Sequence, residues 1–133
     1  MTTTDEDLIS WNGDGLPPAI EQIRQRIDQL PRWQTIGVMQ GWWPILVHLD
    51  EQLREVDPSY QLTQVKQKLG TLEVHLKGPV TSDAVHAALE TSVAQSRVTC
   101  EVCGRPGSLR HSRRGWVAVY CDEHKGYDDE YRT

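Results

Sequence analysis

The residues of this chain that could do chemistry are three cysteines and one histidine near the C-terminal end. Two residues separate Cys100 from Cys103, two separate Cys121 from His124, and 17 residues lie between the pairs. Zinc binds three thiolates and one imidazole as a tetrahedron, and a two-residue gap lets both members of a pair reach one metal from a tight turn. Because four protein ligands leave no open position, the spacing predicts one structural Zn²⁺ per chain.

The spacer between the two pairs is long enough for a β-hairpin that returns the second pair to the first. We expect its strands over residues 107–111 and 116–120, with a turn over residues 112–115. Gly104 follows the second cysteine, where glycine tolerates positive φ and lets backbone amides approach sulfur. Two alternatives are three free thiols and a redox-active C-x-x-C motif. The redox motif would open a helix after a strand and would need no second pair.

The rest of the chain must position this module, and its hydrophobic periodicity predicts three helices. Apolar residues recur every three or four positions over residues 18–30, 44–56 and 82–95. Pro31 ends the first helix and Pro58 ends the second. Residues 71–76 alternate apolar and polar side chains, as in a half-buried strand. Residues 32–41 are interpreted as a connection. The pattern of residues 60–68 does not decide between helix and strand; one interpretation is a strand that enters a turn at Gly70.

Together these elements predict an α+β fold, in which a small helical body with a short strand or hairpin packs on a C-terminal zinc ribbon. We expect a flexible acidic arm over residues 1–15, an α+β body over 16–96, a zinc-ribbon-like module over 97–125 and an acidic tail over 126–133. Only residues 97–99 link the third helix to the first ligand, which is too short for a free tether. Body and module should therefore be packed together.

The net charge of −5 is unevenly distributed along the 133 residues. Residues 1–96 carry a net charge of −6, whereas residues 97–125 carry +3. This division excludes a protein whose whole surface coats nucleic acid, but it sets a basic hairpin against an acidic body. No apolar run approaches about 20 residues, and the N-terminus lacks a signal-peptide pattern. We therefore expect no membrane span and a cytoplasmic location.

One function that fits these features is a protein-interaction module that binds another protein or a second copy of itself. Trp42 and Trp43 are candidate contacts, because neighbours on a helix point about 100° apart and one of the two is expected to be an exposed anchor. Alternatively, one of them lies in the core and the other packs on a loop.

The second function is nucleic-acid binding by the basic hairpin. Its contacts would be Arg105, Arg110, Arg113 and Arg114, with Trp116 stacking on a base. We expect no enzyme, because zinc-deaminase, metalloprotease and phosphate-loop motifs are absent from the sequence. A zinc-hairpin nuclease would have to use His111 with Asp122 or Glu123, which is a weak set.

Two sequence strings carry a resemblance to other proteins. The first is Gln64-Val65-Lys66-x-Lys68-x-Gly70-x-Leu72, and the second is Cys-Glu-x-Cys-Gly-x-Pro-Gly from residue 100, with a later Gly115-Trp116 and C-x-x-H. Over roughly residues 42–124, the chain resembles a group of small uncharacterised bacterial and phage proteins with a C-terminal zinc-ribbon-like module. The resemblance implies zinc ligation by the same four residues and a bacterial or phage setting, and it implies no activity. By analogy alone with other small acidic bacterial and phage proteins, we expect an accessory or inhibitor role.

Overall fold

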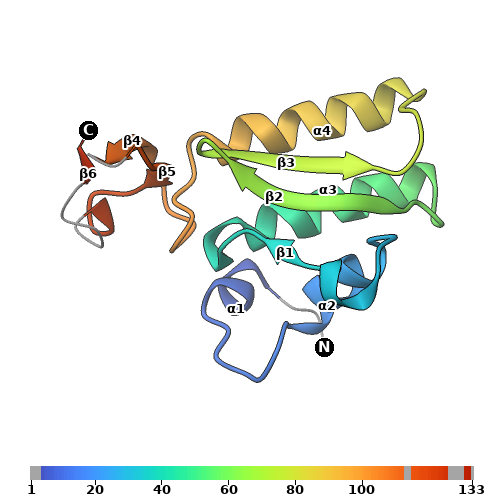
Figure 1. Ribbon diagram of the computed structural model, residues 1–133, viewed down its shortest axis with the longest axis horizontal. Coiled ribbons are helices and arrows are strands. Elements are labelled where there is room, and N and C mark those ends of the chain that lie inside the picture. Colours follow the sequence, from blue (N-terminus) through green and yellow to red (C-terminus); the bar gives the residue numbers. More distant parts are fainter. Residues whose placement is uncertain (1–3, 113–114, 126–130, 133) are drawn as a thin grey trace.

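The computed structural model describes residues 4–112, 115–125 and 131–132 (Figure 1). As predicted, the fold is mixed α+β. Its helices are α1 (Asp5–Ile9), α2 (Pro18–Gln25), α3 (Trp43–Val56) and α4 (Asp83–Ser96), with short 3₁₀ turns η1 (Pro31–Trp33) and η2 (Gln40–Trp42). Its strands are β1 (Ile36–Gly37), β2 (Leu62–Lys68), β3 (Thr71–Leu76), β4 (Ser108–Ser112), β5 (Val117–Tyr120) and β6 (Tyr131–Arg132).

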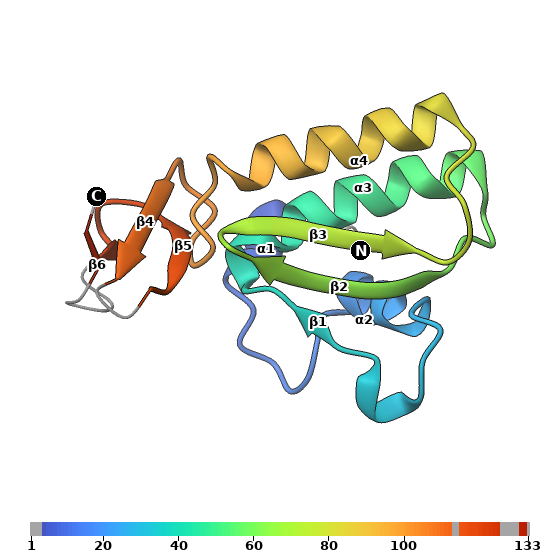
Figure 2. The ribbon, with the colours of Figure 1, turned by 45° about the horizontal axis from the view of Figure 1, so that its top comes forward.

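The body is built on the three-stranded sheet β1-β2-β3, in which β1 is parallel and β3 antiparallel to β2. Helices α3 and α4 run side by side along the sheet (Figure 2). Val65 and Leu72 from the sheet join Leu46, Leu49 and Leu53 from α3 in one buried apolar cluster. Residues 60–68, whose state the sequence left open, therefore contain a strand, and α3 and α4 lie within one residue of their predicted ranges at nearly every end.

The N-terminal segment, for which the acidic composition predicts a flexible arm, contains the short helix α1. Thr4 Oγ1 accepts a hydrogen bond from the Asp7 amide at 3.1 Å, and Asp7 Oδ2 accepts one from the Thr4 amide at 3.2 Å. This reciprocal pair is a capping box at the N-terminus of α1. Leu8 is fully buried in the body core, and Gln40 Nε2 donates to the Trp11 carbonyl at 2.8 Å. The helix is too short for a periodic pattern, so the sequence did not reveal it.

Helix α2 ends at Gln25, earlier than the predicted end before Pro31. Ile27 instead forms a parallel bridge to Leu62, at the start of β2. Leu30, which would have continued the apolar stripe, is exposed. The backbone groups after α2 form their hydrogen bonds with β2 instead of within the helix. Hydrophobic periodicity does not predict such a pairing.

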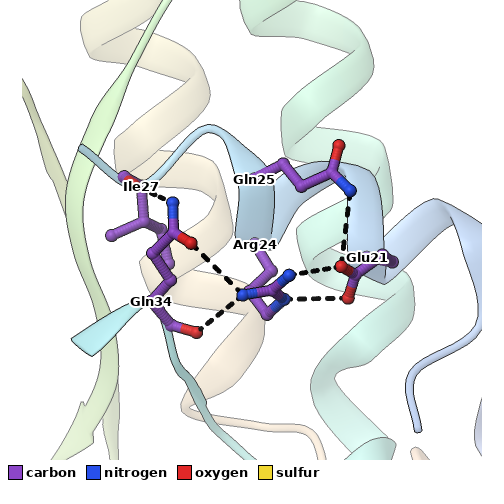
Figure 3. Close-up of polar contacts among 5 residues, drawn as sticks. All are labelled: Glu21, Arg24, Gln25, Ile27 and Gln34. Carbon is purple, nitrogen blue, oxygen red and sulfur yellow. Dashed lines mark hydrogen bonds and ion pairs between the residues drawn. The ribbon is translucent and has the colours of Figure 1, made fainter. Parts of the chain in front are cut away.

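A polar cluster fixes the chain after α2 (Figure 3). Gln34 Nε2 donates to the Ile27 carbonyl at 2.8 Å, and Arg24 Nη1 donates to Gln34 Oε1 at 3.3 Å. Arg24 Nε also donates to Glu21 Oε2 at 2.8 Å, and hydrogen bonding to this guanidinium holds the pKa of the Glu21 carboxyl below its usual value. The cluster holds the start of residues 32–41, which were predicted as a connection. Within this segment, Ile36–Gly37 forms β1 beside β2.

The C-terminal module contains a second sheet of order β5-β4-β6. Its hairpin strands β4 and β5 differ by one residue from the predicted ranges at three of their four ends. Within the acidic tail, Tyr131–Arg132 pairs with β4, while residues 126–130 and 133 lie outside the described residues.

Body and module are joined by direct contacts, as the short linker required. The Gly41 amide donates to the Glu101 carbonyl at 2.7 Å, and Trp42 Nε1 donates to the Thr99 carbonyl at 2.8 Å. Val119 of β5 is fully buried and belongs to the core cluster of the body rather than to that of the module. The hydrophobic core therefore runs across the joint.

Candidate metal centre

Two tight turns bring the four predicted ligands together. The Gly104 amide donates to the Cys100 carbonyl at 3.0 Å, and Gly104 adopts φ +76°, the left-handed conformation expected for this turn. In the second turn the His124 amide donates to the Cys121 carbonyl at 3.1 Å. The three sulfurs and one histidine nitrogen all lie within 4.8 Å of one another. The cluster could hold a metal ion.

Two of the three short distances inside the cluster match those of a tetrahedral centre. Cys103 Sγ lies 3.6 Å from Cys121 Sγ, and His124 Nδ1 lies 3.7 Å from Cys100 Sγ and 3.1 Å from Cys121 Sγ. Metal–ligand bonds of about 2.3 Å to sulfur and about 2.0 Å to nitrogen place tetrahedral neighbours roughly 3.5–3.8 Å apart, a range that includes the first two distances but not the third. A disulfide would need sulfurs about 2.05 Å apart. The geometry therefore favours shared ligation over cysteine pairing.

The thiols differ in how readily they lose a proton. Burial raises the pKa of the Cys103 thiol to about 11. Burial also acts to raise the pKa of the Cys121 thiol, but hydrogen bonds with the side chain and backbone of His124 outweigh it and bring that pKa to about 7. A bound cation would favour the thiolate form of all three cysteines, because metal ligation requires the deprotonated sulfur.

Arg110 supports the second ligand pair instead of facing a nucleic acid. Its side chain is buried; Nε donates to the Tyr120 carbonyl at 3.0 Å, and Nη2 donates to Asp122 Oδ1 at 3.1 Å. These two bonds hold the residues on either side of Cys121. The predicted phosphate contact at Arg110 is therefore wrong, because the guanidinium is enclosed by its own module.

We expect Arg110→Met to weaken metal binding by about 10–100-fold, the range typical of lost groups that orient ligands. The methionine keeps an apolar stem in the buried site but releases the backbone around Cys121. A competition titration against a metal chelator measures the affinity. Arg105→Met is the matched control, because the Arg105–Glu123 pair is exposed and its loss should cost less than about 1 kcal/mol. Equal affinities for the wild type and the Arg110→Met variant would contradict this role.

The two adjacent tryptophans are both buried, contrary to the expectation of one exposed anchor. Trp42 is fully buried and Trp43 nearly so, and both belong to the core cluster of the body. The 3₁₀ turn η2 precedes α3 at this point, so the pair straddles a change of helical geometry, and the module covers Trp42 through Thr99. The expectation of an exposed tryptophan was wrong because the C-terminal module packs over the start of α3.

Of the four other residues predicted to contact a partner or nucleic acid, the structure describes two. Arg105 is exposed and pairs with Glu123 at 2.9 Å, and Trp116 is exposed beside β5. Arg113 and Arg114 lie outside the described residues.

Residues that the sequence analysis did not single out complete the surroundings of the cluster. Gln67 Nε2 donates to Glu101 Oε1 at 2.9 Å and to the Val117 carbonyl at 3.0 Å. Burial raises the pKa of the Glu101 carboxyl, an effect that the hydrogen bond from Gln67 opposes. A Cβ on Gly41 would lie 2.2 Å from the Cys100 carbonyl oxygen, so only glycine fits there. No sequence signal identified these residues, because their contacts cross from one unit to the other.

No protein-family model, curated protein or solved structure matches the chain. Among the described residues, no helix combines the length and apolar character needed to cross a membrane.

Proposed function

We propose that this protein is a non-enzymatic, zinc-stabilised protein-interaction module. Three thiolates with one imidazole are a typical donor set for structural Zn²⁺, and four ligands fill its tetrahedral shell. Because the thiols must stay reduced to bind metal, the cytoplasm is the compartment that we propose. The bacterial or phage setting stays a prediction from the resemblance, and a role as an accessory or inhibitor protein stays a prediction by analogy.

The observation that carries the proposal is a group of exposed apolar side chains where body and module meet. We call this group the junction patch; it consists of Leu69 (67% exposed), Val98 (61%), Leu109 (46%) and Trp116 (65%). These are four of the nine large apolar side chains that are strongly exposed among the described residues. Clustered exposed apolar surface is typical of protein interaction sites, whereas single exposed apolar residues are common.

Contacts of neighbouring residues bring the segments that carry these side chains to one junction. A Cβ on Gly70 would lie 2.3 Å from Leu109 Cδ1 and 3.4 Å from Val117 Cγ1, so the β2–β3 turn meets β4 and β5. On the other side, the Leu72 amide donates to Ser96 Oγ at 3.0 Å, and the Gly107 amide donates to the Val98 carbonyl at 2.8 Å. Figures 1 and 2 both show the β2–β3 turn and the end of α4 facing the module.

The backbone of Leu69 gives a second reason to assign a function to this patch. Leu69 and Gly70 form the two-residue turn between β2 and β3, and Leu69 has φ +53°. Such turns favour asparagine or glycine, and a left-handed leucine costs roughly 1–2 kcal/mol. In the described ranges, no other residue besides glycine has positive φ. Because an exposed leucine gains nothing from burial here, its place in the turn supports a role in contact with a partner.

The same patch favours a protein over a nucleic acid. Three of its four side chains are aliphatic, and base stacking requires aromatic or guanidinium surfaces such as that of Trp116. Burial of Arg110 also removes one of the proposed phosphate contacts.

We expect the double variant Leu69→Asn, Trp116→Ala to keep its fold and lose its partner. Asparagine tolerates the left-handed turn, so the change at Leu69 should not lower the stability of the fold. Affinity for a partner captured from a bacterial lysate, then purified and titrated, should fall about 30-fold, as for interface hot spots. The control is Leu30→Asn, Trp33→Ala, which changes the same residue types at similar exposure, near η1 and away from the module. Unchanged affinity in the junction variant would refute the proposal.

A further inference from the structure

The charges beside the junction patch are unbalanced. Lys68 and Arg97 directly flank Leu69 and Val98 in the chain and are exposed, and neither forms an ion pair within the described part of the structure. Two acidic groups among the described residues of these segments are already engaged or enclosed. Glu73 lies 3.7 Å from Lys66, its cross-strand partner, and Glu101 is buried against Gln67. Within the described residues, the segments that carry the patch therefore also carry two cations without an ion pair.

Most other cations of the body, by contrast, are paired. Elsewhere Arg24 pairs with Glu21, Arg54 with Asp50 and Lys77 with Asp28. Residues 1–96 carry a net charge of −6, so an acidic partner would be repelled from most of the body surface. At the junction, the field of Lys68 and Arg97 would attract it and orient it over the apolar side chains.

We propose that the junction patch binds an acidic amphipathic segment of another protein, a conclusion that rests on the proposed interaction function. Its apolar side chains would cover Leu69, Val98 and Leu109, and its carboxylates would pair with Lys68 and Arg97. Aliphatic contacts supply the apolar area, and the two cations supply selectivity between acidic and basic segments.

The test uses the full, zinc-loaded chain and a displayed library of random dodecapeptides. Peptides that bind in competition with one another should be rich in both acidic and apolar residues. A selected peptide should bind about tenfold more weakly to Lys68→Glu, Arg97→Glu, and its wild-type affinity should fall as salt rises through the range in which exposed charges are screened. The matched control is Arg32→Glu, Lys77→Glu, which makes the same charge change away from the junction and should leave peptide affinity unchanged.

Each other outcome overturns a distinct part of the argument. Selected peptides that lose binding in Leu69→Asn, Trp116→Ala but are neutral or basic would overturn the acidic partner and leave the interaction function standing. Peptides that bind the wild type and this variant equally would overturn both. Tighter binding of single-stranded oligothymidylate, or a concentration-dependent dimer that Lys68→Glu, Arg97→Glu abolishes, would replace the acidic segment with a nucleic acid or a second copy.

Discussion

Replacing Cys103 with serine is expected to release the metal and unfold the C-terminal module. Structural zinc contributes on the order of 10 kcal/mol to small domains of this kind, comparable with the whole stability of an ordinary domain. The module buries few apolar residues of its own: its separate core cluster consists of Cys100, Ala118, Tyr120 and Cys121. Without the fourth ligand, this small cluster cannot compensate for the entropy of ordering the hairpin.

The effect should reach the body, because the joint is continuous. Val119 belongs to the body core and Trp42 donates to the Thr99 carbonyl, so loss of the module exposes both. We expect one zinc per chain in native mass spectrometry of the wild type and none in Cys103→Ser. The variant should also show a red-shifted tryptophan emission and a lower melting temperature, and a chelator should reproduce these changes in the wild type.

His111→Asn is the matched control for this experiment. His111 lies on β4 in the same module, is exposed and is not part of the metal cluster. Its replacement should leave zinc content and melting temperature unchanged. If Cys103→Ser melts at the wild-type temperature, or if chelation has no effect on the wild type, the metal is not structural.

The second large effect is expected for Gly41→Ala, which tests the joint itself. An alanine Cβ would lie 2.2 Å from the Cys100 carbonyl oxygen and 2.5 Å from the Glu101 carbonyl oxygen. Both oxygens belong to the backbone of the turn that carries Cys100 and Cys103, so no side-chain rotation relieves the clash. Such overpacking costs about 1–3 kcal/mol or more, which corresponds to a fall of roughly 5–15 °C in melting temperature.

Gly41→Ala should also weaken zinc binding, because separating the two backbones displaces Cys100 and breaks the hydrogen bond from the Gly41 amide to Glu101. Gly78→Ala provides the control. Gly78 has φ +86° with nothing within 4 Å of an added Cβ, so its variant carries backbone strain without a clash and should bind zinc as the wild type does. A Gly41→Ala variant with wild-type melting temperature and zinc affinity would show that body and module are not coupled at this point.

The elements that the sequence predicted well are those with a strong local signal. Pro44 and Pro58 bound α3, Ser82 accepts from the Val85 amide at the start of α4, and alternation marked β3. The metal cluster was equally accessible, because a two-residue gap between ligands determines a turn whatever surrounds it. By contrast, α1 and β1 are too short to show a periodic pattern. Residues distant in sequence hold them in place; for example, Ile36 of β1 pairs with Val65 of β2.

What the sequence by itself determined is the ligand set, the hairpin that carries it and the α+β class, because these depend on residue type and local spacing. The tertiary structure alone decided which of the predicted contact residues face solvent. It buried Trp42, Trp43 and Arg110, and it brought the separate segments that carry the exposed Leu69, Val98, Leu109 and Trp116 to the junction. Exposure depends on which segment covers which, and that is a property of the packed chain that no local pattern encodes.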